Sequence, residues 1–347
     1  MERRALAVRG IVQGVGFRPF VYNLASELSL TGFVRNDPQG VLIEVEGPAA
    51  ALDRFEGALA SRAPELADIE ACERAELSAL GDLQFRIDRS ATDHRATDHS
   101  DSSSRVTPDI GMCADCLDEL HDPTNRRFRY PFITCAQCGP RLTVVTSVPY
   151  DRERTTMAAF TMCAACRREF DDPHDRRFHA QTISCPACGP RLTLLQAEGA
   201  AGPGFSPSEP LERAVALLGD GSIVAIKGLG GYHLACDATN DRAVDALRLR
   251  KHRDEKPFAV MFASLDVVEG VCEVTTLERE LLVAPARSIV LLRDGLTFIH
   301  DAGFERGAVV SPAGRHAAVD AAARVRCASG TACSRRMRSL SRPSPRP

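Results

Sequence analysis

Hydrophobic and polar positions along residues 1–89 follow patterns that predict one small α+β domain. Apolar and polar residues alternate in RALAVRGIV, GFVRND and GVLIEVEG, as is typical of half-buried strands. Apolar residues recur at helical spacing in PFVYNLASELSL and PAAALDRFEGALASRAP, and LADIEACERAEL and LQFRID complete the set as strands. The order βαββαβ predicts a split ferredoxin-like fold, with both helices on one face of an antiparallel sheet.

The next part of the chain is a linker followed by a sequence repeat. Residues 90–106 are polar and partly repetitive, and they carry too few apolar side chains to form a core, so we predict a linker. Residues 112–143 then align with residues 162–193, which predicts one module built from two copies within residues 107–198. A stretch rich in Pro, Gly and Ser, residues 199–210, marks the next boundary.

Residues 205–300 show a third pattern, in which helices and strands alternate. LERAVALLGDG and NDRAVDALRLRKHR predict helices, and SIVAIKG, PFAVMFA and SIVLLR predict short strands. Asn240 or Asp241 is expected to cap one helix, and Thr275 with Glu278 predicts a capping box on TTLERELL. The last segment, residues 301–347, has nine arginines, no lysine and no clear periodicity, and is expected to be a disordered tail. The predicted fold class is therefore α+β with several domains.

Composition narrows the class of protein. The net charge of −3 selects neither nucleic acid nor a membrane surface as a partner, and no apolar run reaches the roughly 18 residues that span a bilayer. The N-terminus lacks the apolar stretch of a signal peptide, which favours the cytoplasm. Of the 13 cysteines, Cys72, Cys236 and Cys272 show no motif and are interpreted as small buried apolar residues.

Eight other cysteines form four C-x-x-C pairs, with the same 18-residue gap in each repeat. In a reducing compartment this spacing indicates metal binding rather than disulfides. Four thiolates complete a tetrahedron around zinc and leave no open position, so both zinc ions would be structural. Each repeat could hold its own zinc, or knuckles could pair across repeats; pairing along the sequence is favoured. The predicted ligands are Cys113, Cys116, Cys135, Cys138, Cys163, Cys166, Cys185 and Cys188.

A glycine-bearing loop between the first strand and the first helix predicts an anion site. Glycines allow successive N–H groups to point inward, the following helix adds its positive N-terminal end, and Arg18 offers a fork of donors matched to phosphate oxygens. An ordinary surface turn with a solvated arginine is the competing interpretation. The predicted phosphate-binding residues are Gln13, Gly14, Val15, Gly16, Phe17 and Arg18.

VQGVGFRPFVYNLA, together with Asn36 in GFVRND, resembles the acylphosphatase motif. The resemblance implies that the loop and Arg18 bind the acyl phosphate and that Asn36 orients the attacking water. That chemistry needs no nucleophilic side chain or histidine base, because it relies on a positioned water and on stabilisation of phosphoryl oxygens.

Basic residues in the third domain predict a polyphosphate site. Lys227, Lys251, Arg253 and Lys256 lie near glycine turns or a helix end, although a solvated basic helix end would look the same. KGLGGYHLACDA and LRLRKHRDEKPFAVM resemble the YrdC/Sua5 family. The resemblance implies that Lys251 and Arg253 grip the phosphates of ATP with Mg²⁺, with Lys256 and, less closely, Lys227 as further contacts.

The order of the three parts is similar to that of the HypF family of carbamoyltransferases in nickel–iron hydrogenase maturation. The resemblance covers roughly residues 3–297. It implies that carbamoyl phosphate is hydrolysed in the first domain and that ATP converts the carbamate to carbamoyl-adenylate in the third. A last domain would then transfer the carbamoyl group to the C-terminal cysteine of a HypE-type partner.

The sequence departs from that family at its end. The later strands of the YrdC-like domain and the whole last domain are missing from the pattern, so we expect a truncated form of a longer carbamoyltransferase. Two alternatives stay open: a plain acylphosphatase with appended domains, and a zinc scaffold that binds protein or, less expectedly, nucleic acid. The scaffold hypothesis rests on a possible basic patch formed by Arg126, Arg127, Arg129, Arg176 and Arg177.

Overall fold

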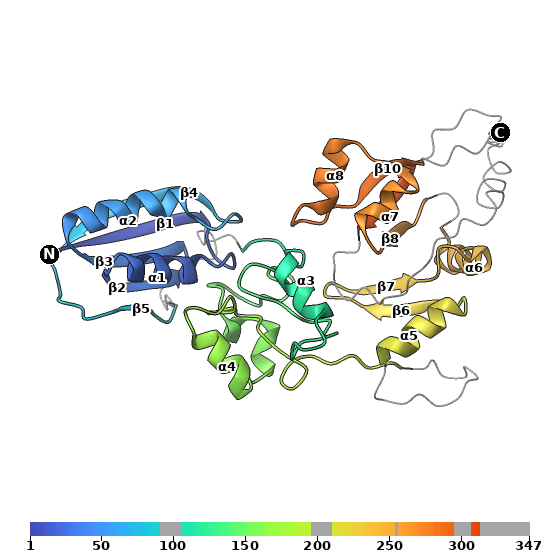
Figure 1. Cartoon of the computed structure of the whole chain (residues 1–347), viewed down its shortest axis with the longest axis horizontal. Helices are drawn as coiled ribbons and strands as arrows, with labels where there is room; N and C mark the ends of the chain where they lie inside the picture. Colours follow the sequence, from blue (N-terminus) through green and yellow to red (C-terminus); the bar gives the residue numbers. More distant parts are fainter. Residues whose placement is uncertain (91–105, 196–209, 254–255, 295–306, 313–347) are drawn as a thin grey trace, which may run out of the picture. The chain divides into compact units, whose positions relative to one another are not determined.

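A computed structural model describes residues 1–90, 106–195, 210–253, 256–294 and 307–312 (Figure 1). The chain divides into two compact units, residues 1–190 and 191–347, and each unit is considered by itself. Within the described residues, every helix falls short of the length and apolar character that crossing a membrane requires.

The first unit begins with the ferredoxin-like domain that the alternating pattern predicted. Strands β4, β1, β3, β2 and β5 lie in that order, and only the edge pair β2 and β5 is parallel. The strand β5 therefore extends the four-stranded sheet by one short edge. The elements are β1 (Glu2–Ile11), α1 (Phe17–Glu27), β2 (Thr31–Asp37), β3 (Gly40–Gly47), α2 (Ala49–Ser61), β4 (Asp68–Leu77) and β5 (Phe85–Ile87).

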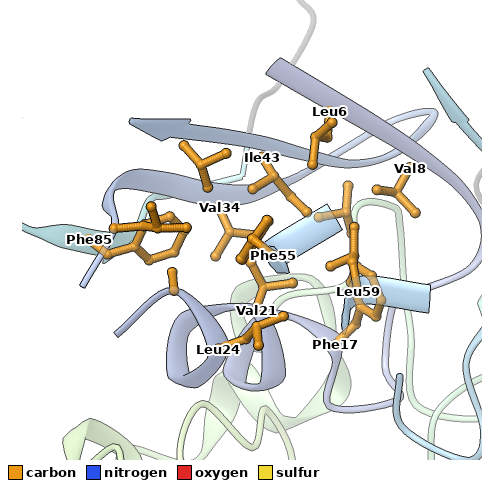
Figure 2. Packing of buried hydrophobic residues seen from close by; sticks show 14 of the residues in the cluster. Leu6, Val8, Phe17, Val21, Leu24, Val34, Ile43, Phe55, Leu59 and Phe85 are labelled. Carbon is orange, nitrogen blue, oxygen red and sulfur yellow. The ribbon is translucent and has the colours of Figure 1, made fainter. Parts of the chain in front are cut away.

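Both helices of this domain bury their apolar stripe against the sheet. Figure 2 shows Val21 of α1 and Phe55 of α2 in one cluster with Val34 and Ile43 of the sheet, and all four are fully buried. Complete burial of such side chains contributes about 1.5–3 kcal/mol each. This core fixes the end of β1 relative to the start of α1, where the glycine loop lies.

The repeat forms the rest of the first unit, and each copy begins with a short helix after its first knuckle cysteine. These helices are α3 (Ala114–His121) and α4 (Ala164–Asp171), and two short 3-10 helices, η1 (Arg152–Arg154) and η2 (Thr156–Ala159), lie between the copies. The copies brace one another reciprocally. Arg127 of the first copy pairs with Glu169 of the second at 2.5 Å, and Arg177 of the second pairs with Glu119 of the first.

The second unit contains two sheets. Strands β6 (Val224–Lys227) and β7 (Tyr232–Ala235) form a hairpin, and β8 (Ala259–Phe262), β11 (Gly307–Pro312), β10 (Val290–Asp294) and β9 (Cys272–Glu273) form the other sheet in that order. The helices are α5 (Pro210–Gly219), α6 (Asp241–Lys251), α7 (Leu265–Glu269) and α8 (Thr276–Val283).

Local signals in the second unit meet several expectations and miss one strand. Asn240 caps α6 by accepting a hydrogen bond from the backbone of Ala243 at 3.2 Å, and Thr275 and Glu278 form the capping box of α8. The strand β11 lies beyond residue 300, where a tail without structure was expected, and it pairs with β8 and β10. The remaining tail, like most of the linker, lies outside the described residues.

The isolated cysteines do not all behave as small buried apolar residues. Cys272 is buried, but Cys72 is exposed and Cys236 is only half-buried. The prediction was wrong for Cys72 because it lies on β4, an edge strand of the sheet whose burial pattern is largely exposed.

Candidate functional site: two thiol clusters and an anion cavity

The eight knuckle cysteines form two groups of four, one in each copy of the repeat. Within each group, all Sγ atoms lie within 4.8 Å of one another. The Sγ pairs lie 3.5–3.8 Å apart in the first group and 3.6–3.8 Å apart in the second. Four thiolates at a Zn–S distance of about 2.3 Å form a tetrahedron with S···S separations of about 3.8 Å. The residues therefore fit zinc, and the grouping is the sequential one.

Each thiol cluster is contacted by an arginine from the opposite copy. Arg126 donates to Cys166 Sγ at 3.3 Å, and Arg176 donates to Cys116 Sγ at 3.1 Å. A zinc ion with four thiolates carries net negative charge, so these guanidinium groups offset it from the outer shell. The same arginines also pair with Glu169 and Glu119, respectively.

These contacts correct the idea of a basic patch. Arg127 and Arg177 are buried, at 1% and 3% exposure, and together with Arg126 and Arg176 they form ion pairs between the two copies. Four of the five arginines proposed for nucleic acid are therefore engaged in holding the zinc module together.

The glycine loop has the backbone that an anion site requires. Gly14 and Gly16 have φ angles of 79° and 77°, a region that glycine occupies at little cost, and Gly16 also accepts the first hydrogen bond of α1 at its carbonyl. The Gln13 side chain faces backbone groups. Its amide nitrogen donates to the carbonyls of Asp37 and Gly40, so it ties the loop to the β2–β3 turn.

The side-chain donors of Arg18 and Asn36 converge on one oxygen atom. Arg18 Nη2 and Asn36 Nδ2 donate to the backbone carbonyl of Tyr150, at 3.1 and 3.0 Å. The other arm of the arginine fork, Nη1, pairs with the carboxylate of Asp151 at 2.8 Å. Gln13 completes the contact, because its Oε1 accepts the backbone N–H of Tyr150 at 2.8 Å.

The segment that supplies these acceptors, residues 149–151, belongs to the zinc module, and we call it the strap. At the Arg18 fork, the Tyr150 carbonyl and the Asp151 carboxylate are the oxygen acceptors. The strap therefore brings two oxygen atoms to the glycine-loop end of the ferredoxin-like domain from a segment more than 100 residues away along the chain.

A small cavity remains beside this contact. It has a volume of about 30 Å³, enough for roughly two water molecules. Asn36 Oδ1 is buried and has no hydrogen-bond partner among the described residues, which suits an acceptor for a water molecule. The lining side chains include Arg18, Asn36, Arg141, Tyr150 and His179.

Burial sets the protonation of two aromatic residues around the cavity. Burial, together with the positive charge of Arg18, lowers the pKa of His179 from 6.5 to about 4, so its imidazole is neutral at pH 7. Burial likewise raises the pKa of the Tyr150 phenol, which stays protonated. The zinc module thus adds two uncharged side chains, Tyr150 and His179, to a cavity to which it also adds the guanidinium of Arg141.

Sequence reasoning missed the contribution of the zinc module to the cavity beside Arg18 and Asn36. The strap lies between the two copies of the repeat, where the sequence has no internal counterpart. Arg141 is part of a flank that the copies share, yet it is buried at 2% exposure while its counterpart Arg191 is exposed. The one feature of the sequence that could have indicated this contribution is that Tyr150 and Asp151 lie in the segment between the copies, which is not repeated.

The residues expected to bind nucleotide do not gather around the described cavity of the second unit. Lys227, at the end of β6, lies over the ring of Tyr232 at 5.0 Å, and Arg253 donates to the carbonyl of Pro257 at 3.2 Å. Lys251 and Lys256 are exposed at and after the end of α6. The cavity lies instead beside the start of α6 and is lined by residues 220–223, 240, 242, 243, 246 and 250.

Comparison with known proteins places all three parts of the chain. The acylphosphatase family model matches residues 4–87, the HypF finger model matches residues 112–145 and 162–195, and the telomere recombination model of the Sua5/YciO/YrdC type matches residues 216–315. Carbamoyltransferase HypF2 of Cupriavidus necator is 53% identical over 297 residues, which are 84% of this chain and 35% of that protein. The chain belongs to the HypF family.

Solved structures and a single-domain relative agree with this placement. A crystal structure of full-length HypF in a phosphate- and nucleotide-bound form matches with a TM-score of 0.81 and 40% identity, over 92% of this chain and 41% of that one. An acylphosphatase of Thermus thermophilus is 45% identical over 74 residues, which are 83% of that protein. The chain spans about a third of the length of curated HypF relatives from Cupriavidus necator and Rhizobium leguminosarum.

Proposed function

We propose that residues 1–190 hydrolyse carbamoyl phosphate, as the first step of a HypF-type carbamoyl transfer. One observation carries the proposal: Arg18 and Asn36, which lie on different elements, direct their donors at a single oxygen position beside the glycine loop. Such convergence is what a site for phosphoryl oxygens and a reacting water requires.

In the proposed reaction, the substrate phosphate replaces the strap oxygens at the Arg18 fork. Asn36 Oδ1 accepts a hydrogen bond from a water molecule, whose oxygen attacks phosphorus in line with the leaving group. The bond between phosphorus and the carbamoyl oxygen breaks, carbamate leaves, and the proton of the water passes to solvent. Arg18 and the loop N–H groups stabilise the charge that develops on the phosphoryl oxygens.

The zinc module would hold two structural Zn²⁺ ions, through the thiol groups of Cys113 and Cys163 and their six partners. When bound, zinc supplies rigid cross-links between knuckles and takes no part in the reaction, because four thiolates fill its coordination. Thiols in this state need a reducing compartment, which supports a cytoplasmic protein.

The later steps are proposed from family membership. The HypF relatives are named carbamoyltransferases, and one solved HypF structure is in a phosphate- and nucleotide-bound form. We infer that the second unit contributes to binding ATP with Mg²⁺ for carbamoyl-adenylate formation, through Lys227, Lys251, Arg253 and Lys256. We further infer that the last step of the pathway transfers the carbamoyl group to the C-terminal cysteine of a HypE-type protein.

Phosphate release from carbamoyl phosphate tests the proposal. The full chain should release phosphate, and Arg18→Ala should reduce kcat/KM by at least about a hundredfold, the scale of losing one preorganised oxyanion donor. Arg9→Ala is the matched control, because Arg9 is a half-exposed arginine on β1 whose ion pair with Glu73 lies outside the site. No release by the wild-type chain would refute the proposal. Equal turnover of acetyl phosphate would favour a general acylphosphatase.

A further inference from the structure

Arg141 links the first thiol cluster to the glycine loop. Its Nε donates to the carbonyl of Gly14, on the loop of the ferredoxin-like domain. Its two terminal nitrogens donate to carbonyls of the second knuckle of the first cluster, at 2.9–3.4 Å. Every donor group of the buried guanidinium is thus directed at backbone oxygen, and the accepting residues are Gly14, Cys135, Ala136, Cys138 and Pro140.

The loop needs such a contact because its glycines make it flexible. Gly14 has a φ angle of 79°. Glycine populates positive and negative φ angles about equally, so the residue itself does not hold the loop in this conformation. Carbonyl and N–H of one peptide lie in a common plane. Anchoring the Gly14 carbonyl therefore fixes the orientation of the Gly14–Val15 peptide, one of the loop peptides whose N–H groups would bind an anion in the proposed site. A loop held in its binding conformation binds more tightly than one that must be ordered first.

The second copy of the repeat shows that this arginine is not required to build a zinc knuckle. Arg191 stands in the same Gly-Pro-Arg-Leu-Thr flank, and it is exposed. Cys185 and Cys188 nevertheless bring their Sγ atoms to 3.7 Å, as close as Cys135 and Cys138 in the first copy. The burial of Arg141 therefore serves a purpose particular to the first copy.

We propose that Arg141 is a positioning residue for the phosphate loop, and that it makes the first zinc knuckle a part of the anion site. This inference rests on the proposed anion-binding function of the loop. It assigns different roles to two chemically equivalent zinc sites: the first supports anion affinity through Arg141, and the second lacks this connection.

The test uses the full chain and inorganic phosphate. Arg141→Lys keeps the charge but loses the planar fork. We expect it to retain two zinc ions per chain and to bind phosphate about tenfold more weakly, the loss expected for one hydrogen bond to a charged group. Calorimetry gives the affinity, elemental analysis gives the zinc content, and the KM for carbamoyl phosphate should rise by a similar factor. Arg191→Lys, the matched control, should leave all three unchanged.

Each other outcome is decisive. If Arg141→Lys binds phosphate as the wild type does, or if Arg191→Lys weakens binding equally, Arg141 does not position the loop. If Arg141→Lys or Arg141→Gln loses a zinc ion, the residue is part of the knuckle itself and the inference is wrong. If the wild-type chain binds no phosphate, the proposed function fails before the role of Arg141 is at issue.

Discussion

Replacing Asp151 by asparagine should make the protein bind inorganic phosphate more tightly. The Asp151 carboxylate pairs with Arg18 Nη1 at 2.8 Å, in the position that we propose for a phosphate oxygen. Phosphate must therefore break this pair before it can use the full arginine fork. Asparagine has the same shape and can still accept a hydrogen bond, but it removes the negative charge that competes with phosphate.

The size of the effect follows from the burial of the pair. The side chains of Arg18 and Asp151 are only 9% and 24% exposed, so solvent screens their interaction weakly. A hydrogen bond between charged groups contributes about 1.5–3 kcal/mol of net stabilisation, and the neutral amide oxygen of asparagine would keep part of that contribution. Since 1.4 kcal/mol corresponds to a factor of ten, phosphate affinity should rise by about tenfold or more.

Isothermal calorimetry with the full chain at neutral pH measures this change directly. Glu153→Gln is the matched control, because it removes the same charge two residues further on from an exposed side chain. It should leave the phosphate affinity within a factor of two, given how weakly exposed charges act at this range. Unchanged or weaker binding by Asp151→Asn would show that the carboxylate helps to hold the anion rather than competing with it.

Two further predictions concern the zinc module. Arg127→Ala should lower the free energy of unfolding by about 3 kcal/mol in urea titration, because it removes a fully buried side chain that donates to both Glu169 and the carbonyl of Ser184, and leaves Glu169 with only the partly exposed Arg126. Arg167→Ala, which breaks an exposed pair with Asp171 at 3.7 Å, should cost under about 1 kcal/mol; equal losses would contradict this reasoning. His179 should titrate near pH 4 by NMR, and because this pKa lies below the unfolded value of 6.5, stability should fall from pH 6.5 to pH 4. His179→Gln should flatten that slope, and a midpoint near 6.5 would refute the burial argument.

The features that sequence predicted well are those encoded over short distances. Periodicity set by the geometry of one strand or helix predicted the ferredoxin-like order, and fixed cysteine spacing predicted two thiol clusters. Cap signals such as Thr275 with Glu278 act within a single turn of helix. In each case the residues that define the feature lie within about 25 positions of one another, so the pattern is visible in the sequence itself.

The features that sequence missed depend on contacts between distant segments. Arg18 meets Asp151 across 133 positions, and Arg127 meets Glu169 across 42. Neither pairing leaves a periodic trace. A run of arginines looks the same in sequence whether it is solvated or buried against carboxylates, which is why the basic patch was a reasonable but incorrect hypothesis. The strand β11 was missed because its pairing partners, rather than its own short sequence, define it.

Duplication of the zinc repeat has a physical consequence for the anion site. The reciprocal pairs, Arg127 with Glu169 and Arg177 with Glu119, exist only because two copies face each other. These pairs hold the two copies in a fixed relative position. Arg141 of the first copy and His179 of the second copy therefore line the same cavity. One copy could bind zinc but could not hold both walls. The strap lies between the two copies, and each of its ends continues into a copy that is held in place. This arrangement keeps Tyr150 and Asp151 against Arg18, although neither residue belongs to a thiol cluster.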